Sequence, residues 1–464
     1  MVVTAVLPAL GRDAVASFNY VRFSSLQELV GEFYSTRDLL SAVNRVLQTD
    51  QRLSDQDELG VTRSAQLRPL GRLLLAHQES QTVRGYAAIM LARYLAPFSS
   101  AALTRAQFSD QGRHIWAVTL AASQCVEFAV EDLSFATGDM LSRWFFAPDK
   151  MAAVRAIGSR VLSATEKGWL ALSWIDSATR PQGLQHVRSF DVILGRHSNL
   201  STLAQLDAYY SYFPALRGSF PEMLSAVERS RAKAALKLLG ASRPFFPRVR
   251  FRVPMVAVDA FYLPVYHAVV IPPAVMFAPF FDQRAPAPMN YGSLGHIIAH
   301  EVTHGLDPRF SAFGSRGEYR DWWSNESRAR FKSRLACLRE LYNNASVAVT
   351  GIRFGDTARG ENLADAGGIR KALDAFKALS PQGAQRLGER SYFPEQLFFI
   401  SSCHKWCNPE HRSRDSVLSE DITKKYSPPQ MRCNVPLMNT EEFSQAFGCE
   451  DASYMNPKKK CDVF

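Results

Sequence analysis

The feature that most constrains this chain of 464 residues is one short run with two histidines, in which His300, Glu301 and His304 form the pattern His-Glu-x-x-His. Residues four apart share one face of a helix, so the imidazoles of His300 and His304 can bind a single metal ion. Glu301 lies three residues before His304 and can reach a water molecule at that ion. The pattern therefore predicts a buried, metal-binding helix that ends near Gly305.

A second motif offers a third ligand. The run Gly-Glu-Asn-Leu-Ala-Asp at 360–365 puts Glu361 at a distance of 57 residues (361 − 304) from His304. A catalytic zinc ion usually takes three protein ligands and keeps one position for water, so Glu361 would complete the set. Asp365, one helical turn later, would accept the second N–H of a ligand imidazole. The alternative is a buried helix with hydrogen-bonded core histidines, and the two motifs together favour zinc.

The part of the chain after about residue 250 resembles the neprilysin and endothelin-converting enzyme family of zinc metallopeptidases. The resemblance rests on both motifs, on Asp-Ala-Phe-Tyr at 259–262 and on Tyr-Met-Asn-Pro-Lys-Lys-Lys-Cys at 454–461, and it is faint before residue 250. It implies a mainly α fold with a small β-sheet, a two-lobed zincin. A partial helical lid lobe would cover residues 1–225, and a thermolysin-like catalytic lobe would cover residues 226–464.

The apolar pattern agrees with this organisation. Apolar residues recur at three- and four-residue spacing over 26–47, 66–95, 149–174 and 203–239, which predicts a mostly helical first half. The helical spacing stops near residues 242–253, where proline and arginine cluster. The β-branched and aromatic residues at 257–271 predict strands, and an edge strand beside the zinc helix can receive a peptide as an added strand.

The resemblance also assigns roles to individual residues. It makes Glu301 the general base, Asp365 and Asp307 the carboxylates that orient the imidazoles, and Arg432 the group that binds a substrate carbonyl. Asp307 could instead be a turn residue. The remaining substrate-binding residues would be Asp259 and Ala260 beside the peptide backbone, with Val275, Phe280, Ile297 and Trp406 around the large apolar side chain that follows the cleaved bond. Ordinary core packing is the alternative for these last four.

Two positions depart from the family pattern. Asp259 replaces an asparagine, and an ionised aspartate accepts hydrogen bonds but does not donate them. Tyr426 replaces a histidine that helps to stabilise the transition state; its hydroxyl could still donate, or it could simply pack on the surface. The sequence therefore leaves two hypotheses open. One is an active endopeptidase, and the other is a catalytically impaired relative that binds zinc and peptides.

Charge and cysteines bear on partners and compartment. The formal net charge is +10, but the basic residues are dispersed and form no nucleic-acid-binding motif, so we expect oligopeptide partners and no nucleic acid. No run has the length and composition of a membrane span or a signal peptide, and nothing indicates an oligomeric state. Seven cysteines suggest an oxidising compartment. The resemblance then implies an extracellular or cell-surface protein in which the anchor and about the first third of the family's ectodomain are missing.

The resemblance also suggests how the cysteines pair. It pairs Cys337 with Cys461, and Cys403 and Cys433 are extra cysteines that could pair with each other. The partners of the remaining three would lie in the missing amino-terminal part, and these three are Cys125, Cys407 and Cys449.

Overall fold

The computed structural model of the chain contains two compact units that interleave along the sequence. The first takes its residues from Met1–Ala136 and Asn199–Pro254, and the second from Thr137–Ser198 and Met255–Phe464. The structure describes residues 18–30, 35–47, 52–62, 68–69, 71–73, 76, 81–100, 102–103, 123, 126–127, 129–237, 253–315, 317, 320–380, 385–387, 390–407 and 426–464. The expected mainly helical fold with a small sheet is confirmed.

This division differs from the single boundary that we expected at residue 225. Residues 137–198 were assigned to the lid lobe, but they belong to the unit that contains the zinc motifs. The physical reason is helix α8 (Pro148–Ala171), which packs on the helices that carry both motifs. Its buried residues recur every three or four positions, so its apolar face lies in the core of the second unit.

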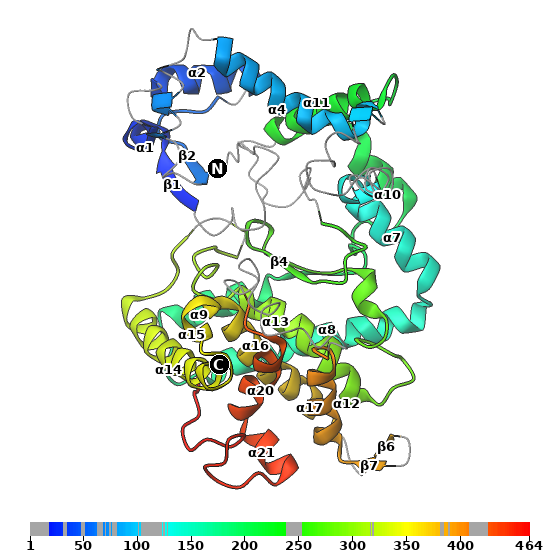
Figure 1. The fold of residues 1–464 in the computed structure, drawn as a ribbon, viewed down its shortest axis with the longest axis vertical. Coiled ribbons are helices and arrows are strands. Elements are labelled where there is room, and N and C mark those ends of the chain that lie inside the picture. Colours follow the sequence, from blue (N-terminus) through cyan, green and yellow to red (C-terminus); the bar gives the residue numbers. More distant parts are fainter. Residues whose placement is uncertain are drawn as a thin grey trace. The chain divides into compact units, whose positions relative to one another are not determined.

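The first unit is helical with one two-stranded sheet. Strands β1 (Phe18–Arg22) and β2 (Glu58–Thr62) pair antiparallel. The expected helix over 203–239 is interrupted after Tyr209 by a 3-10 turn and a link in which Gly218 has a φ of +88°. Among its described residues, the α-helices that lie wholly in this unit are α1 (Leu26–Val30), α2 (Thr36–Leu47), α4 (Gln81–Ser99), α10 (Leu203–Tyr209) and α11 (Phe220–Lys237) (Figure 1).

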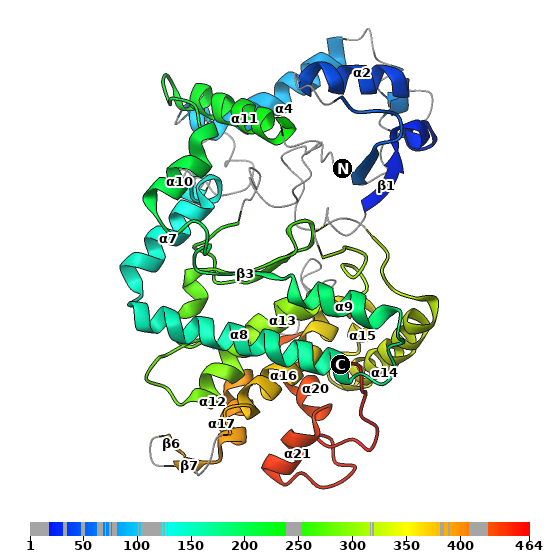
Figure 2. The same cartoon turned by 180° about the vertical axis from the view of Figure 1, so that it is seen from behind.

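The second unit is built around two central helices, α13 (His296–His304) and α16 (Arg359–Lys377), which lie side by side in both views (Figures 1 and 2). Most of α7 (Ser134–Phe145) and all of α8 also belong to this unit. Its other helices are α9 (Thr179–Arg188), α12 (Ala287–Asn290), α14 (Asn325–Thr350), α15 (Phe354–Thr357), α17 (Pro394–His404), α20 (Pro429–Met438) and α21 (Glu441–Phe447). A short hairpin joins β6 (Gln385–Leu387) to β7 (Arg390–Tyr392).

A three-stranded sheet in the second unit has the order β3-β5-β4. Its central strand β5 (Ala268–Ile271) is fully buried, with β3 (Asp191–Leu194) parallel on one side and β4 (Phe261–Leu263) antiparallel on the other. β4 therefore forms an edge of this sheet, as expected. The helical pattern of the first half did not predict β3, because its four residues are too few to give a periodic signal.

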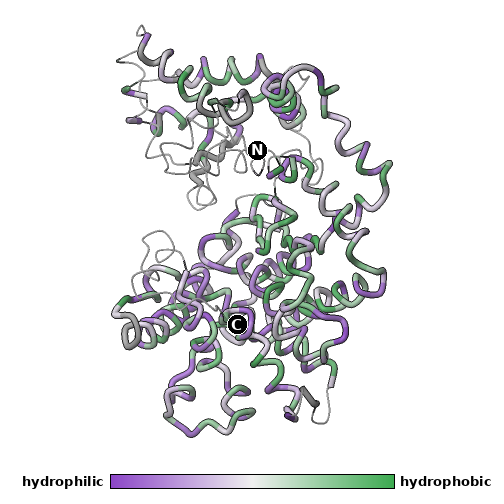
Figure 3. Tube along the Cα trace, turned by 45° about the vertical axis from the view of Figure 1, so that its right-hand side comes forward, coloured by the Kyte–Doolittle hydropathy of each residue, from purple (hydrophilic) through white to green (hydrophobic). Residues whose placement is uncertain are grey.

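The close approach of α13 and α16 depends on glycine. A Cβ atom added to Gly368 would lie 2.9 Å from the backbone nitrogen of His300 and 3.0 Å from its Cα. A π-helical turn, Tyr291–Gly295, leads directly into α13. Both hydrophobic and hydrophilic residues are spread along the tube of the chain (Figure 3). Among the described residues, no helix is both long and apolar enough to span a membrane.

Candidate active site

Helix α13 holds both motif histidines and Glu301 inside the second unit. The exposed fractions of His300, Glu301 and His304 are 8%, 7% and 6%. The helix ends at His304, as the sequence predicted, and the backbone N–H of Gly305 bonds back to carbonyls of the last turn. Nearly every other residue of α13 is buried as well, which is typical of a helix at the centre of a core.

Three potential ligand atoms converge between α13 and α16. The Nε2 atoms of His300 and His304 are 3.1 Å apart, and Oε2 of Glu361 lies 3.3 Å from the first and 3.5 Å from the second. A tetrahedral zinc ion with bonds of about 2.0–2.2 Å holds its ligand atoms roughly 3.3–3.6 Å apart. The donor set therefore has the spacing that one zinc ion requires.

The other nitrogen of each imidazole is bound to a carboxylate. Nδ1 of His300 donates to Oδ1 of Asp365 at 2.9 Å, and Nδ1 of His304 donates to Oδ2 of Asp307 at 2.9 Å. These bonds place the protons on Nδ1 and leave the Nε2 lone pairs facing each other. With Nδ1 of each ring held as a donor, Nε2 is the atom that can bind a metal ion, so the orientation of both rings fits a bound zinc ion.

The charges around the ligands favour an added cation. Burial alone lowers the pKa of His304, but the charge of Glu361 and the bond to Asp307 outweigh it and raise this pKa to about 10. Burial alone would raise the pKa of Glu361, yet the two histidines hold it far below its usual range. The site thus stabilises positive charge next to a carboxylate that stays ionised. The residues present fit a divalent metal ion by geometry, tautomer and charge.

Arg309 joins the ligand Glu361 to the orienting carboxylate Asp307, and the sequence analysis did not predict it. Its Nη2 lies 3.4 Å from Oδ2 of Asp307 and 3.4 Å from Oε1 of Glu361. A Cβ atom on Gly360 would lie 2.5 Å from the same Nη2, so glycine at 360 makes room for the guanidinium. Arg309 stands two residues after Asp307, but its spacing alone gave no sign that it would reach α16.

Glu301 lies beside the three ligands. Its pKa is raised, first by burial and then by the charges of Glu361 and Asp259, against the opposing effect of the two histidines. A carboxylate with a raised pKa accepts a proton more readily at neutral pH than an exposed one. The surroundings of Glu301 are therefore those that a general base needs.

Arg432 contacts Asp365, where the resemblance implied a substrate carbonyl. Its Nε donates to Oδ2 of Asp365 at 2.7 Å and its Nη2 donates to Oδ1 at 2.8 Å. The guanidinium carbon lies 4.1 Å from the ring centre of Trp406 and 5.1 Å from that of Tyr426. This two-point contact fixes Asp365 and leaves Nη1 of Arg432 for other acceptors, so the role at a carbonyl remains a prediction.

The two residues that depart from the family pattern lie at the same site. Burial raises the pKa of Tyr426, and the charges of Glu361, Asp259 and Glu301 raise it further, so Tyr426 is close to the acidic residues of the centre. Asp259 is exposed and precedes β4, and its Oδ1 accepts the N–H of Ala260 at 3.0 Å. Asp259 and Ala260 lie directly before the edge strand, which begins at Phe261, and not within a strand as the pattern over 257–271 predicted; their role in substrate binding remains a prediction.

The residues of the expected specificity pocket differ in exposure. Val275 is 2% exposed and belongs to the main core, and Phe280 and Ile297 pack against that core as partly buried residues. Trp406 is half-buried. For Val275 the structure matches the alternative of core packing, because its side chain is almost wholly enclosed. A pocket role for the other three remains a prediction.

Lys405 is a second residue that the sequence analysis missed. It caps α17 next to Trp406, is half-buried, and interacts electrostatically with Asp365 and Arg432. Burial lowers its pKa to about 7, although Asp365 opposes this shift and Arg432 adds to it. The sequence did contain a clue, because Lys405 directly precedes Trp406, and Trp406 was expected to line an apolar pocket.

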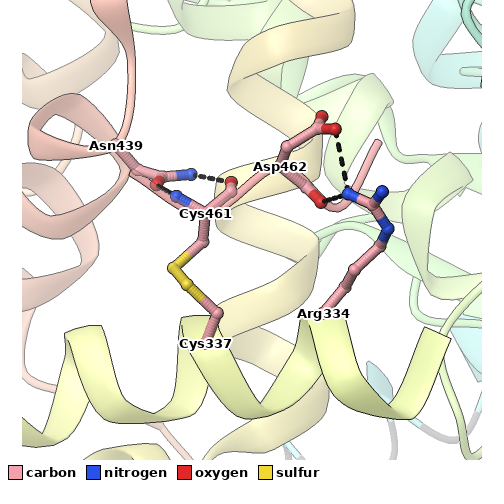
Figure 4. The surroundings of a disulfide bond; sticks show 5 residues. All are labelled: Arg334, Cys337, Asn439, Cys461 and Asp462. Atoms are coloured by element: carbon pink, nitrogen blue, oxygen red, sulfur yellow. Dashed lines mark hydrogen bonds and ion pairs between the residues drawn. A yellow bond between two sulfur atoms is a disulfide. The ribbon is translucent and has the colours of Figure 1, made fainter. Parts of the chain in front are cut away.

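Both expected disulfides are present. Cys337 on α14 bonds to Cys461 near the end of the chain, next to a hydrogen bond from the amide of Asn439 to the Cys461 carbonyl (Figure 4). Cys403 on α17 bonds to Cys433 on α20. Within the described residues, Cys407 and Cys449 form no disulfide, and Cys125 lies outside those residues.

Comparisons with known proteins agree with this centre. Two sequence models of Peptidase family M13 match the chain, one over residues 3–196 and one over residues 259–463. The chain is 32% identical to Neprilysin-1 of Caenorhabditis elegans over 346 residues, which is 73% of this chain and 45% of that protein. It is 30% identical to endothelin-converting enzyme 1 of Bos taurus over 343 residues, which is 73% of this chain and 45% of that protein.

Solved structures agree on the fold. A zinc metalloprotease of Mycobacterium tuberculosis in complex with an inhibitor superposes with a TM-score of 0.69 at 24% identity, covering 97% of this chain and 67% of that one. PepO of Lactobacillus rhamnosis gives a TM-score of 0.71 at 18% identity, with 95% and 66% covered. The chain spans somewhat less than half the length of the curated relatives named above, 45% in each case. On these matches and on its paired zinc motifs, the chain belongs to peptidase family M13.

Proposed function

We propose that this chain is a zinc-dependent metalloendopeptidase that hydrolyses peptide bonds in extracellular oligopeptides, on the amino side of large apolar residues. The observation that carries the proposal is the triangle of His300 Nε2, His304 Nε2 and Glu361 Oε2, whose edges measure 3.1, 3.3 and 3.5 Å. Membership of peptidase family M13 supports it. The chain spans only 45% of the length of its relative Neprilysin-1, so peptidase activity of this chain is itself part of what we propose.

In this mechanism zinc, when bound by the three ligands, would supply a Lewis acid that polarises the scissile carbonyl and acidifies water. Glu301 accepts a proton from the attacking water and returns it to the leaving amine, a task that suits a buried carboxylate with a raised pKa. Asp365 and Asp307 keep the imidazoles oriented by accepting their Nδ1 protons.

The substrate backbone would align with the edge strand β4, beside Asp259 and Ala260. Nη1 of Arg432 is proposed to bind a substrate carbonyl, and the hydroxyl of Tyr426 to donate to the oxyanion. The apolar side chain after the cleaved bond would contact Phe280, Ile297 and Trp406, with Val275 behind them in the core. A donor aimed at the oxyanion typically lowers the barrier by about 3 kcal/mol.

The substitution Glu301→Gln tests the catalytic assignment. It keeps the shape of the side chain but removes the base, so zinc content should stay near one ion per chain while cleavage of an internally quenched peptide falls by at least about a hundredfold. The exposed Glu450→Gln is the matched control and should change neither quantity. Turnover unchanged by Glu301→Gln would refute the role of this residue.

The second candidate is a catalytically impaired relative that still binds zinc and peptides. Asp259 and Tyr426 favour it, because both replace residues that contact the substrate in the family. The paired change Asp259→Asn with Tyr426→His restores the family residues. Hydrolysis that appears only in this variant would support the second candidate, and chelator-sensitive hydrolysis by the natural chain would support the first.

The proposed location is the cell exterior or the cell surface. The two disulfides support it, since disulfides persist in oxidising compartments and are rare in the cytosol.

A further inference from the structure

Lys405, which forms no ion pair with the residues that the structure describes, lies beside the candidate zinc centre. The ammonium group of Lys405 is 5.5 Å from the centre of the Trp406 ring, and the guanidinium carbon of Arg432 is 4.1 Å from the centre of the same ring. Two cationic side chains thus share one aromatic surface. Since an aromatic ring offsets a nearby cation only weakly, this arrangement calls for a negative charge.

Asp365 is the carboxylate that interacts with both cations, but its oxygens are already bound. Oδ1 accepts from His300 and from Arg432, and Oδ2 accepts from Nε of Arg432. Among the described residues, no carboxylate forms an ion pair with Lys405. Asp365 thus binds Arg432 and His300 directly and acts on Lys405 only at longer range.

The neighbouring groups give no other compensation. His296, which also interacts electrostatically with Lys405, is kept neutral by burial, and its Nε2 donates to the backbone carbonyl of Asp365 at 3.2 Å. The Nε1–H of Trp406 is buried with no acceptor among the described residues. The indole N–H is enclosed, whereas Lys405 is only half-buried and has no hydrogen-bond acceptor among the described residues.

We propose that Lys405, which lies by the Trp406 ring beside Arg432, forms a subsite that binds a carboxylate of the substrate, supplied by an acidic side chain near the cleaved bond or by the peptide's own carboxyl terminus. This inference rests on the proposed peptidase function and adds a charge preference to it. The apolar pocket residues would bind the large side chain, and Lys405 would select peptides that carry a negative charge within reach of it.

The test measures peptide binding without cleavage. In the zinc-loaded full chain with Glu301→Gln, fluorescence anisotropy gives the Kd of labelled hexapeptides with a central Phe. One pair of peptides, both amidated, differs by Glu or Gln next to that Phe. A second pair differs by a free or an amidated carboxyl terminus. These two pairs distinguish the two sources of the carboxylate.

We expect the anionic member of at least one pair to bind about tenfold more tightly at low salt, and this preference should weaken as salt is added. Lys405→Met should abolish the preference, so that both peptides of a pair bind with about equal affinity. Lys405→Arg should keep most of the preference. Lys332→Met removes an exposed lysine on α14 and should leave the preference unchanged. Zinc content and circular dichroism confirm that each variant is folded.

Equal affinity for both members of both pairs, no measurable binding, or a preference that survives Lys405→Met would overturn the subsite. These results are independent of catalysis. If the chain with Glu301 intact cleaves neutral peptides but shows no charge preference, only the subsite fails. If the Glu301→Gln variant shows the charge preference but the chain with Glu301 intact cleaves no peptide, the proposed function fails and the subsite stands.

Discussion

The substitution Gly368→Ala tests whether the spacing of α13 and α16 controls zinc binding. The new Cβ atom would lie 2.9 Å from the backbone nitrogen of His300, whereas ordinary van der Waals contact begins near 3.4 Å, so the atoms are about 0.5 Å too close. Backbone atoms cannot rotate away as a flexible side chain can. The two helices must therefore move apart, which carries Glu361 away from the histidines.

The expected magnitudes follow from this displacement. Zinc–ligand distances tolerate changes of about 0.2 Å, and a misplacement of about 1 Å at a catalytic site can cost roughly a hundredfold. A shift of about half an ångström should then weaken zinc affinity by about tenfold. Overpacking costs about 1–3 kcal/mol in the free energy of unfolding, and the better helix propensity of alanine offsets about 1 kcal/mol of it.

The assay is zinc affinity by competition with a chromogenic chelator, together with thermal unfolding of the metal-free protein. Gly168→Ala on α8 is the matched control, because no atom lies within 4 Å of its added Cβ. It should stabilise the fold by up to about 1 kcal/mol and leave zinc affinity unchanged. The reasoning is refuted if Gly368→Ala binds zinc as tightly as Gly168→Ala does.

Two further predictions concern stability. Replacing Cys337 and Cys461 by Ser opens a loop with a sequence separation of 124 and should lower the unfolding free energy by about 5 kcal/mol. The same change at Cys403 and Cys433, whose separation is 30, should lower it by about 3.5 kcal/mol. Urea titration measures both losses, and equal losses would contradict the loop-length argument. Burial lowers the pKa of Lys371 from 10.5 to about 7, so the unfolded chain binds its proton more tightly and the unfolding free energy should rise as pH increases from about 7 to 10.5. Lys371→Met should remove this part of the rise and stabilise the protein at pH 7 by at most about 5 kcal/mol. Urea titrations at pH 7 and pH 9 measure the unfolding free energy of both proteins. If it changes between these pH values by the same amount in the natural chain and in Lys371→Met, the prediction of a buried lysine with a lowered pKa is wrong.

The zinc ligands could be predicted from sequence because their chemistry is local. His300 and His304 lie on one helix, where the spacing of four residues fixes their relation, and Glu361 belongs to a second recognisable motif. Arg309 and Lys405 could not be predicted in the same way. Their roles depend on how α13, α16 and α17 pack, and no spacing along the chain records that packing.

The fold shows the same distinction. Long helices such as α8 give a periodic apolar pattern, so their position was predicted to within a few residues. β3 gave no pattern because it is four residues long and gains its stability from pairing with β5, which is more than seventy residues away in the chain. The two compact units differ from the single expected boundary for a related reason, since contacts between distant segments decide them.

The interleaved order of the two units limits how this protein can be shortened. A recombinant piece that begins at Met255 would keep all three zinc ligands but would lack β3 and α8, leaving one edge of β5 and the apolar faces of α13 and α16 open to solvent. Such a piece should aggregate through those surfaces. During synthesis the segment 137–198 must likewise wait for the residues after 255 before it can bury its apolar side chains, and the bond between Cys337 and Cys461 can close only after residue 461 has been made.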